Sequence, residues 1–97
     1  MKNYFQKAKV YQTRGIANEA EVDRKFKGEV NQALNKFFIG DWGIVNDEDK
    51  QANIEALQYF DRVLGAYMTS KGKIWISGES HNGTYYDVVI VLFPREY

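Results

Sequence analysis

Apolar side chains recur at steps of three and four residues in the first half of the chain, which is the period of an amphipathic helix. The pattern covers residues 22–37, and Asn18 followed by Glu21 has the spacing of a capping arrangement before it. Gly28 interrupts the pattern at a cost of about 1 kcal/mol relative to alanine, which a well-docked helix tolerates. The sequence therefore predicts one helix from about residue 18 to residue 37.

A second helical segment begins where acidic residues crowd together. Asn46 is a favourable N-cap residue, and the carboxylates that follow it suit the positive end of a helix dipole. Ile54 and Leu57 continue a helical period towards Phe60. We expect the second helix to begin at Asn46 or Asp47 and to end at about Phe60.

Four segments are rich in the β-branched and aromatic residues of strands. The first mixes apolar with charged residues and predicts a partly buried strand over residues 7–16. Asn82-Gly83 favours a tight hairpin turn between the last two segments. Three consecutive strands are predicted after the second helix, over residues 63–68, 73–77 and 84–93.

These elements give the order β-α-α-β-β-β in a single α+β domain of residues 1–97. We expect an antiparallel sheet of about four strands with the two helices packed on one face. The first strand lies at an edge of this sheet or beside the last strand. Because residues 88–93 place apolar groups on both faces, the open face is a candidate for partner binding or for pairing in a homodimer.

The composition fits one globular domain. The 97 residues are 44% hydrophobic and 15% aromatic, which is enough to fill one modest core without disulfides or a metal ion. Cysteine is absent, which fits a reducing compartment and excludes a disulfide framework. No apolar stretch is long enough for a signal peptide or a membrane span, so we expect a cytoplasmic protein with no membrane partner.

Charge is balanced overall but not along the chain. Residues 1–36 carry eight Lys or Arg against four Asp or Glu, whereas residues 37–97 carry five against nine. This asymmetry predicts a dipolar surface that can steer a charged partner. It lacks the large basic excess of a dedicated nucleic-acid-binding domain.

The chain offers few groups for catalysis. Its single histidine, His81, precedes Asn82-Gly83 in a predicted turn, and a catalytic triad needs a positioned base. The glycines are scattered and form no phosphate-binding loop of the Walker or dinucleotide type. We therefore expect a protein that is not an enzyme and that uses no cofactor.

Acidic residues gather in and around the second predicted helix. Oxygen ligands at this density could hold a hard cation, but the spacing differs from that of an EF-hand loop, and helix capping explains most of the cluster, so we predict no metal site. Alternatively, the carboxylates imitate a run of phosphates and occupy a basic groove on another protein. The candidate partner-binding residues are Asp41, Asp47, Glu48, Asp49, Glu55 and Asp61.

Basic and aromatic residues alternate along the first predicted strand. On a sheet, this arrangement can hold a backbone phosphate and stack a base. Acidic residues on the following helix neutralise any longer basic stripe, so a solvated surface is the other interpretation. The candidate nucleic-acid-binding residues are Lys7, Lys9, Tyr11 and Arg14.

Ordered blocks in residues 40–97 resemble a known family. They include Gly40-Asp41-Trp42-Gly43, Arg62-Val63-Leu64-Gly65-Ala66-Tyr67, Lys73-Ile74-Trp75-Ile76 and Leu92-Phe93-Pro94-Arg95-Glu96-Tyr97. The chain is similar in these blocks to the small bacterial plasmid-related proteins, which are common on plasmids, integrative elements and phages and sometimes carry the label of a type I restriction subunit. The family usually has an acidic-aromatic or an acid-Asp-Arg-Ser run after the tryptophan strand, whereas residues 77–83 intervene here and only Glu79 corresponds to it.

The resemblance implies a biological setting rather than an activity. Proteins of mobile elements meet the defence systems of their hosts, and small anti-CRISPR proteins are similar in size, in lacking catalytic residues and in using surface charge. We therefore expect a non-enzymatic inhibitor whose partner is a host defence effector such as a CRISPR nuclease. The alternatives are a small nucleic-acid-binding regulator and a homodimeric interaction module.

Overall fold

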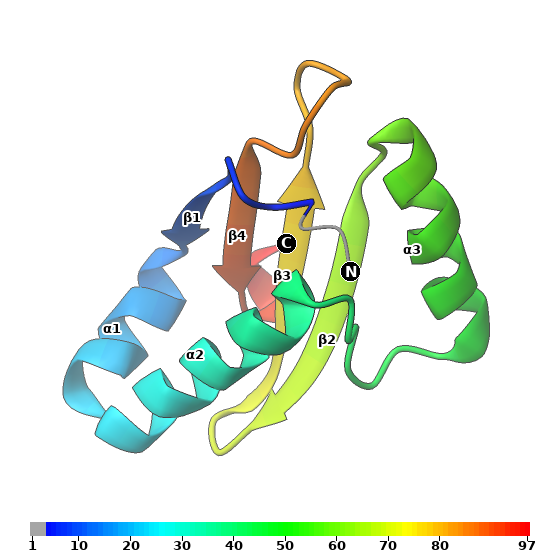
Figure 1. The fold of residues 1–97 in the computed structure, drawn as a ribbon. Helices are drawn as coiled ribbons and strands as arrows, with labels where there is room; N and C mark the ends of the chain where they lie inside the picture. Colours follow the sequence, from blue (N-terminus) through cyan, green and yellow to red (C-terminus); the bar gives the residue numbers. More distant parts are fainter. Residues whose placement is uncertain (1–3) are drawn as a thin grey trace.

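The computed structural model describes residues 4–97 and confirms an α+β fold with a four-stranded sheet (Figure 1). The described residues form three α-helices, where the pattern predicts two. Met1–Asn3, which belong to the expected domain of residues 1–97, lie outside the described residues. The elements are β1 (Lys9–Gln12), α1 (Arg14–Val22), α2 (Arg24–Phe38), α3 (Asp47–Tyr59), β2 (Val63–Thr69), β3 (Gly72–Glu79), β4 (Val88–Leu92) and the 3₁₀ helix η1 (Pro94–Glu96).

The chain enters its first helix earlier than the hydrophobic pattern predicts. The side-chain oxygen of Thr13 accepts a hydrogen bond from the N–H of Ile16 and so caps α1. The strand predicted over residues 7–16 therefore ends at Gln12, and Ile16 is fully buried on a helix instead. Arg14, which we expected on the strand, is the first residue of α1.

A break at Asp23 makes two helices of the single helix predicted from residue 18 to residue 37. The Asp23 carboxylate accepts a hydrogen bond from the N–H of Phe26, which caps α2 where α1 ends. The helical phase restarts at this break. Val22, which the pattern placed in the apolar stripe, is consequently 81% exposed.

Helix α3 and the hairpin of β2 and β3 lie close to their predicted positions. The side chain of Asn46 accepts a hydrogen bond from the N–H of Asp49, which confirms the predicted start of α3. Phe60 ends the helix in the left-handed conformation, with φ at 57°. Gly72 provides the positive φ, 100°, that the turn between β2 and β3 requires.

The connection between β3 and β4 is longer than the predicted hairpin turn. The side-chain oxygen of Asn82 accepts hydrogen bonds from the N–H groups of Thr84 at 2.7 Å and Tyr85 at 3.0 Å. These bonds fold the loop around one side chain, so the two strands do not pair up to the turn. The strand predicted over residues 84–93 therefore begins only at Val88.

The sheet is mixed rather than fully antiparallel. Its order is β1-β4-β3-β2, with β1 parallel to β4 and the other two pairs antiparallel. The first strand thus lies both at an edge and beside the last strand. Two parallel neighbouring strands need a crossover connection between them. Helices α1 and α2 form the first part of the connection from β1 to β4 and pass across one face of the sheet (Figure 1).

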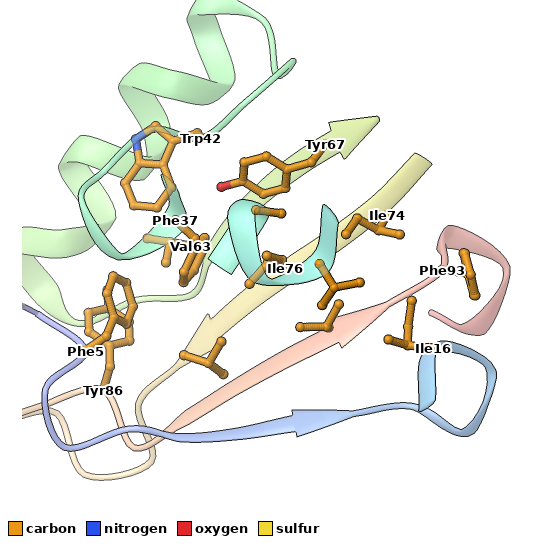
Figure 2. Close-up of a cluster of buried hydrophobic side chains, with 14 of the residues drawn as sticks. Phe5, Ile16, Phe37, Trp42, Val63, Tyr67, Ile74, Ile76, Tyr86 and Phe93 are labelled. Atoms are coloured by element: carbon orange, nitrogen blue, oxygen red, sulfur yellow. The ribbon is translucent and has the colours of Figure 1, made fainter. Parts of the chain in front are cut away.

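The hydrophobic core lies between the sheet and the helices, and Figure 2 shows part of it. At one end, Phe5 packs against Phe37 and Tyr86, with ring centroids 4.8 Å and 5.0 Å apart. Ile16 and Phe93 lie at the other end (Figure 2). The strands contribute the buried side chains of Val63, Tyr67, Ile74, Ile76, Val89 and Val91.

The opposite face of the sheet is less open than the sequence led us to expect. The ring of Tyr97 packs against Trp75, with 5.4 Å between the centroids, and the Arg62 guanidinium lies 4.4 Å from the Tyr97 ring. Leu92, the β4 partner of Trp75, is only 6% exposed. Residues that follow β4 thus cover part of this face, and a groove of about 300 Å³ with Ile90 in its wall lies beside them.

Candidate interaction surfaces

The connector between α2 and α3 covers one edge of the sheet. The carbonyl of Trp42 accepts a hydrogen bond from the N–H of Ala66 at 3.0 Å, and the N–H of Ile44 donates to the Ala66 carbonyl at 2.8 Å. Gly43 lies between them at a φ of 77°, and a Cβ there would stand 1.9 Å from the Ala66 carbonyl oxygen. Only glycine therefore allows the connector to approach β2 this closely.

Asn53 extends the same protection along β2. Its side-chain amide donates to the carbonyl of Leu64 at 2.9 Å and accepts from the N–H of Leu64 at 3.1 Å. The amide thus replaces a neighbouring strand at this point, and Asn53 is only 6% exposed. Sequence reasoning missed this residue because a polar group in a helix suggests a surface position, although Asn53 stands one turn before the buried Leu57.

Two buried tyrosines hold the backbone at the two ends of residues 41–61, which we call the acidic segment. The hydroxyl of Tyr67 donates to the carbonyl of Asp41 at 2.7 Å, and that of Tyr86 donates to the carbonyl of Asp61 at 2.6 Å. Burial raises the pKa of Tyr86 to about 12 and raises the pKa of Tyr67 as well, so both hydroxyls stay protonated donors. The segment is therefore fixed to the core at both ends.

The structure distributes the predicted acidic residues along this segment. Because Asn53 and Leu57 face the protein, the helical period puts Glu48 and Glu55 on the opposite, exposed side of α3. Asp47 and Asp49 join Glu48 in the first turn. Asp41 lies in the connector and Asp61 lies beyond the far end of α3, whose 13 residues span about 20 Å. Three of the six carboxylates are thus brought together, and the other three are spread along the segment.

The carboxylates of the acidic segment form no ion pair with the rest of the described chain. Elsewhere, Glu19 and Asp23 both lie 3.4 Å from the Lys71 ammonium, and Glu79 lies 3.8 Å from Arg62. Among residues 4–97, none of the six candidate carboxylates has a basic group within the 4.0 Å of an ion pair. This part of the surface therefore presents an excess of negative charge that no ion pair holds.

These carboxylates do not converge as metal ligands do. Within the described part of the chain, no three His, Asp or Glu side chains lie close enough together to hold a metal ion. The carboxylate of Asp41 instead accepts a hydrogen bond from the N–H of Gly43 at 3.0 Å. The arrangement suits contacts with several separate cations on another molecule better than coordination of one ion.

The predicted basic residues lie at the other edge of the sheet, in and beside β1. The strand register places Lys9 and Tyr11 on the sheet face that points away from the helices, where both are exposed. The Lys7 ammonium lies 5.0 Å from the ring centroid of Tyr85, a cation–π contact that sequence reasoning missed. Arg14 lies beyond the strand on α1, so the structure brings Lys9 and Tyr11 together and separates Arg14 from their row.

His81 lies in the exposed connection between β3 and β4. Its Nδ1 is 3.0 Å from the Asp87 carboxylate, which also accepts a hydrogen bond from the His81 N–H. The hydrogen bond and charge of Asp87 raise the pKa of His81, and the pKa of Asp87 is correspondingly lowered. The pair joins the two ends of one loop, which is a structural role.

Comparison with known proteins adds no relative from which a role could be transferred. No protein-family model matches the sequence, and neither a curated protein nor a solved structure is detectably similar to it. No helix among residues 4–97 combines the length and the apolar character of a membrane span.

Proposed function

We propose that this protein is a non-enzymatic binding protein whose acidic segment occupies a basic surface on another protein. The observation that carries the proposal is the excess of negative charge in residues 41–61, where six carboxylates stand with a single lysine and form no ion pair. Because these carboxylates give up no internal ion pair on binding, their full attraction to a partner remains. Complementary charge of this kind accelerates association and selects the partner.

The partner that we propose is a nuclease of a host defence system, such as a CRISPR effector. The groove in which such a nuclease holds nucleic acid is lined by basic residues that recognise phosphates. Helix α3 spans about 20 Å, which is the axial length of about six phosphates along one DNA strand. The resemblance to plasmid-related proteins supports the same setting, because inhibition of host defence benefits a mobile element.

Affinity capture with purified CRISPR effectors tests this proposal. We expect at least one effector to retain the protein, and we expect added guide or target nucleic acid and rising salt to release it. Glu55→Lys should weaken capture at least tenfold, whereas Glu21→Lys should leave it within about twofold, because Glu21 is an exposed helical carboxylate on α1, away from the acidic segment. If no effector retains the protein, or if both variants behave alike, the acidic segment is not the inhibitory surface.

A nucleic-acid-binding function is the second candidate, favoured by the exposure of Lys9 and Tyr11 on one face of β1. It predicts salt-sensitive binding of single-stranded RNA or DNA that Lys9→Glu weakens and Glu55→Lys does not. A flat titration with both nucleic acids at low ionic strength would eliminate it.

A further inference from the structure

The two edges of the sheet differ in whether their outward backbone groups have hydrogen-bond partners. At the β2 edge, Leu64 pairs with the Asn53 amide and Ala66 pairs with the connector. The β1 edge lies at the other end of the sheet, and its four residues, Lys9–Gln12, are all exposed. Natural proteins usually cover or shorten such edges, because the unpaired backbone groups attract another strand.

The backbone of β1 has one side available for pairing. The N–H of Lys9 donates to the carbonyl of Asp87, and the N–H of Thr13 donates to that of Val91, so the odd-numbered residues face β4. In a parallel ladder the alternate residues point the other way, which directs the N–H and C=O groups of Val10 and Gln12 outward. Among residues 4–97, no hydrogen bond outside the β1–β4 ladder reaches either residue.

The charge around this edge selects its occupant. Residues 7–14 carry three basic side chains and no acidic one. A second copy paired along β1 would bring two such basic segments together, which is unfavourable. A nucleic acid would meet the basic side chains but would leave unused the alternating N–H and C=O groups, which match an extended peptide backbone. The complement of the edge is therefore an acidic peptide in the extended conformation.

A hollow beside the edge fits the same occupant. It has a volume of about 300 Å³ and lies where β1 meets α1 and α2. A strand added next to β1 would point alternate side chains towards the helices at the level of Gln12, and so into this hollow. Its wall carries one cation, Lys27, and one carboxylate, Glu21, so it suits an uncharged side chain of the bound segment. The lining residues are Gln12, Ala17, Ala20, Glu21, Lys27 and Asn31.

We propose that β1 binds an extended, acidic segment of a partner protein as a fifth strand of the sheet. The peptide backbone pairs with the outward groups of Val10 and Gln12, its carboxylates approach Lys9 on one face, and a side chain on the other face enters the hollow. This surface lies at the sheet edge opposite to the acidic segment (Figure 1). Peptide binding at β1 can therefore be tested independently of the proposed nuclease inhibition.

A peptide titration followed by NMR tests the proposal. The probe is a peptide of about seven alternating glutamate and valine residues, a usual strand length, and its control carries lysine in place of glutamate. The glutamate peptide should shift the amide signals of Val10 and Gln12 and slow their hydrogen exchange at least tenfold. The lysine peptide should leave both unchanged. Equal binding of both peptides, shifts away from β1, or no shifts at millimolar peptide would overturn the proposal.

Two variants distinguish the contribution of backbone hydrogen bonds to peptide binding from the contribution of charge. Val10→Pro removes an outward N–H without removing a bond to β4, so it should weaken peptide binding at least tenfold. The melting temperature of this variant shows whether it still folds. Lys9→Glu should weaken binding similarly, whereas Lys73→Glu, an exposed strand lysine on the same face, should not. Equal effects of these two charge reversals would refute a site at β1.

Two other occupants would also overturn the proposal. Sedimentation that shows a dimer lost in Val10→Pro, with no peptide present, would assign the edge to a second copy of the chain. Binding of single-stranded RNA that persists in Val10→Pro and excludes the glutamate peptide would assign it to nucleic acid.

Discussion

At the scale of single residues, Asn53 is the buried polar side chain of the acidic segment. Asn53→Ala leaves the N–H and the C=O of Leu64 without their partner in a partly buried place. We expect it to lower the free energy of unfolding by about 2–3 kcal/mol, measured by urea denaturation. Asn31→Ala, at an exposed position of α2, should change it by less than about 0.5 kcal/mol. Similar values for the two variants would contradict the strand-like pairing of Asn53.

The pair of His81 and Asp87 makes a second prediction at this scale, about pH. The pKa of His81 is raised in the folded protein, so its contribution to stability is present below the unfolded pKa of about 6.5 and is lost as the pH rises through the folded value. The pKa of Asp87 is lowered, so its contribution is lost as the pH falls through its folded value. The contribution of the His81–Asp87 pair to the free energy of unfolding should therefore be largest at about pH 5 and small at pH 8.

An NMR titration checks this prediction directly, because the chain has one histidine. The imidazole should titrate above its usual pKa in the wild type, and Asp87→Asn should return the pKa towards the usual value. Asp61→Asn removes a carboxylate outside this contact and should leave the titration unchanged. A histidine that titrates identically in all three proteins would contradict the contact.

At the scale of elements, alanine substitutions at two helical glycines distinguish the effect of helix propensity on stability from the effect of packing. Gly28 in α2 has no atom within 4 Å of the place where a Cβ would stand, so Gly28→Ala should raise the free energy of unfolding by about 1 kcal/mol. At Gly15 in α1 a Cβ would stand 2.6 Å from the Glu96 carboxylate, which is held by the Thr13 hydroxyl and by the N–H of Phe93. Gly15→Ala should therefore be less stable than Gly28→Ala by at least about 1 kcal/mol. Thermal unfolding of both variants measures the difference, and equal stabilisation would refute the role of Glu96.

The elements also show how far local pattern determines this fold. The start of α3 was predictable because its signal is local: Asn46 bonds to a backbone group three residues away. The break at Asp23 was not, since Asn18 and Glu21 offered a competing cap with the same spacing. The position of β1 at an edge beside β4 agrees with the prediction, but its parallel direction was not predictable, because the backbone bonds that set it join two segments near opposite ends of the sequence.

The candidate surfaces were predictable to a similar extent. Composition alone located the six acidic and the four basic or aromatic candidates, since charge is visible in the sequence. The absence of ion pairs at the six acidic candidates among residues 4–97 depends on tertiary packing, and the open backbone of Val10 and Gln12 depends on which strand lies at an edge. Asn53 and Tyr67 position the acidic segment through contacts with distant backbone groups, and no pattern in the sequence marks such contacts.

At the scale of the whole molecule, the two charged surfaces lie at opposite edges of one sheet. The basic residues flank β1, and the acidic segment runs beside β2 (Figure 1). The formal net charge is zero, so no overall repulsion opposes contact between copies. A neutral molecule with this dipole should attract its own copies head to tail when salt is scarce, and screening should remove the attraction.

Sedimentation velocity at about 20 mM and about 300 mM salt, where the Debye length falls from roughly 20 Å to roughly 6 Å, measures this attraction. We expect weak association that grows with protein concentration at low salt and disappears at high salt. The double variant Lys9→Glu with Glu55→Lys keeps the net charge but reduces the dipole, so its association should be lost. Lys73→Glu with Glu21→Lys also keeps the net charge, yet it adds a carboxylate near Asp49 and a cation beside β1, so it should associate at least as strongly as the wild type. Self-association that does not change with salt concentration, or that falls equally in both double variants, would contradict this prediction. It would show that the separation of charge between the two sheet edges does not drive self-association.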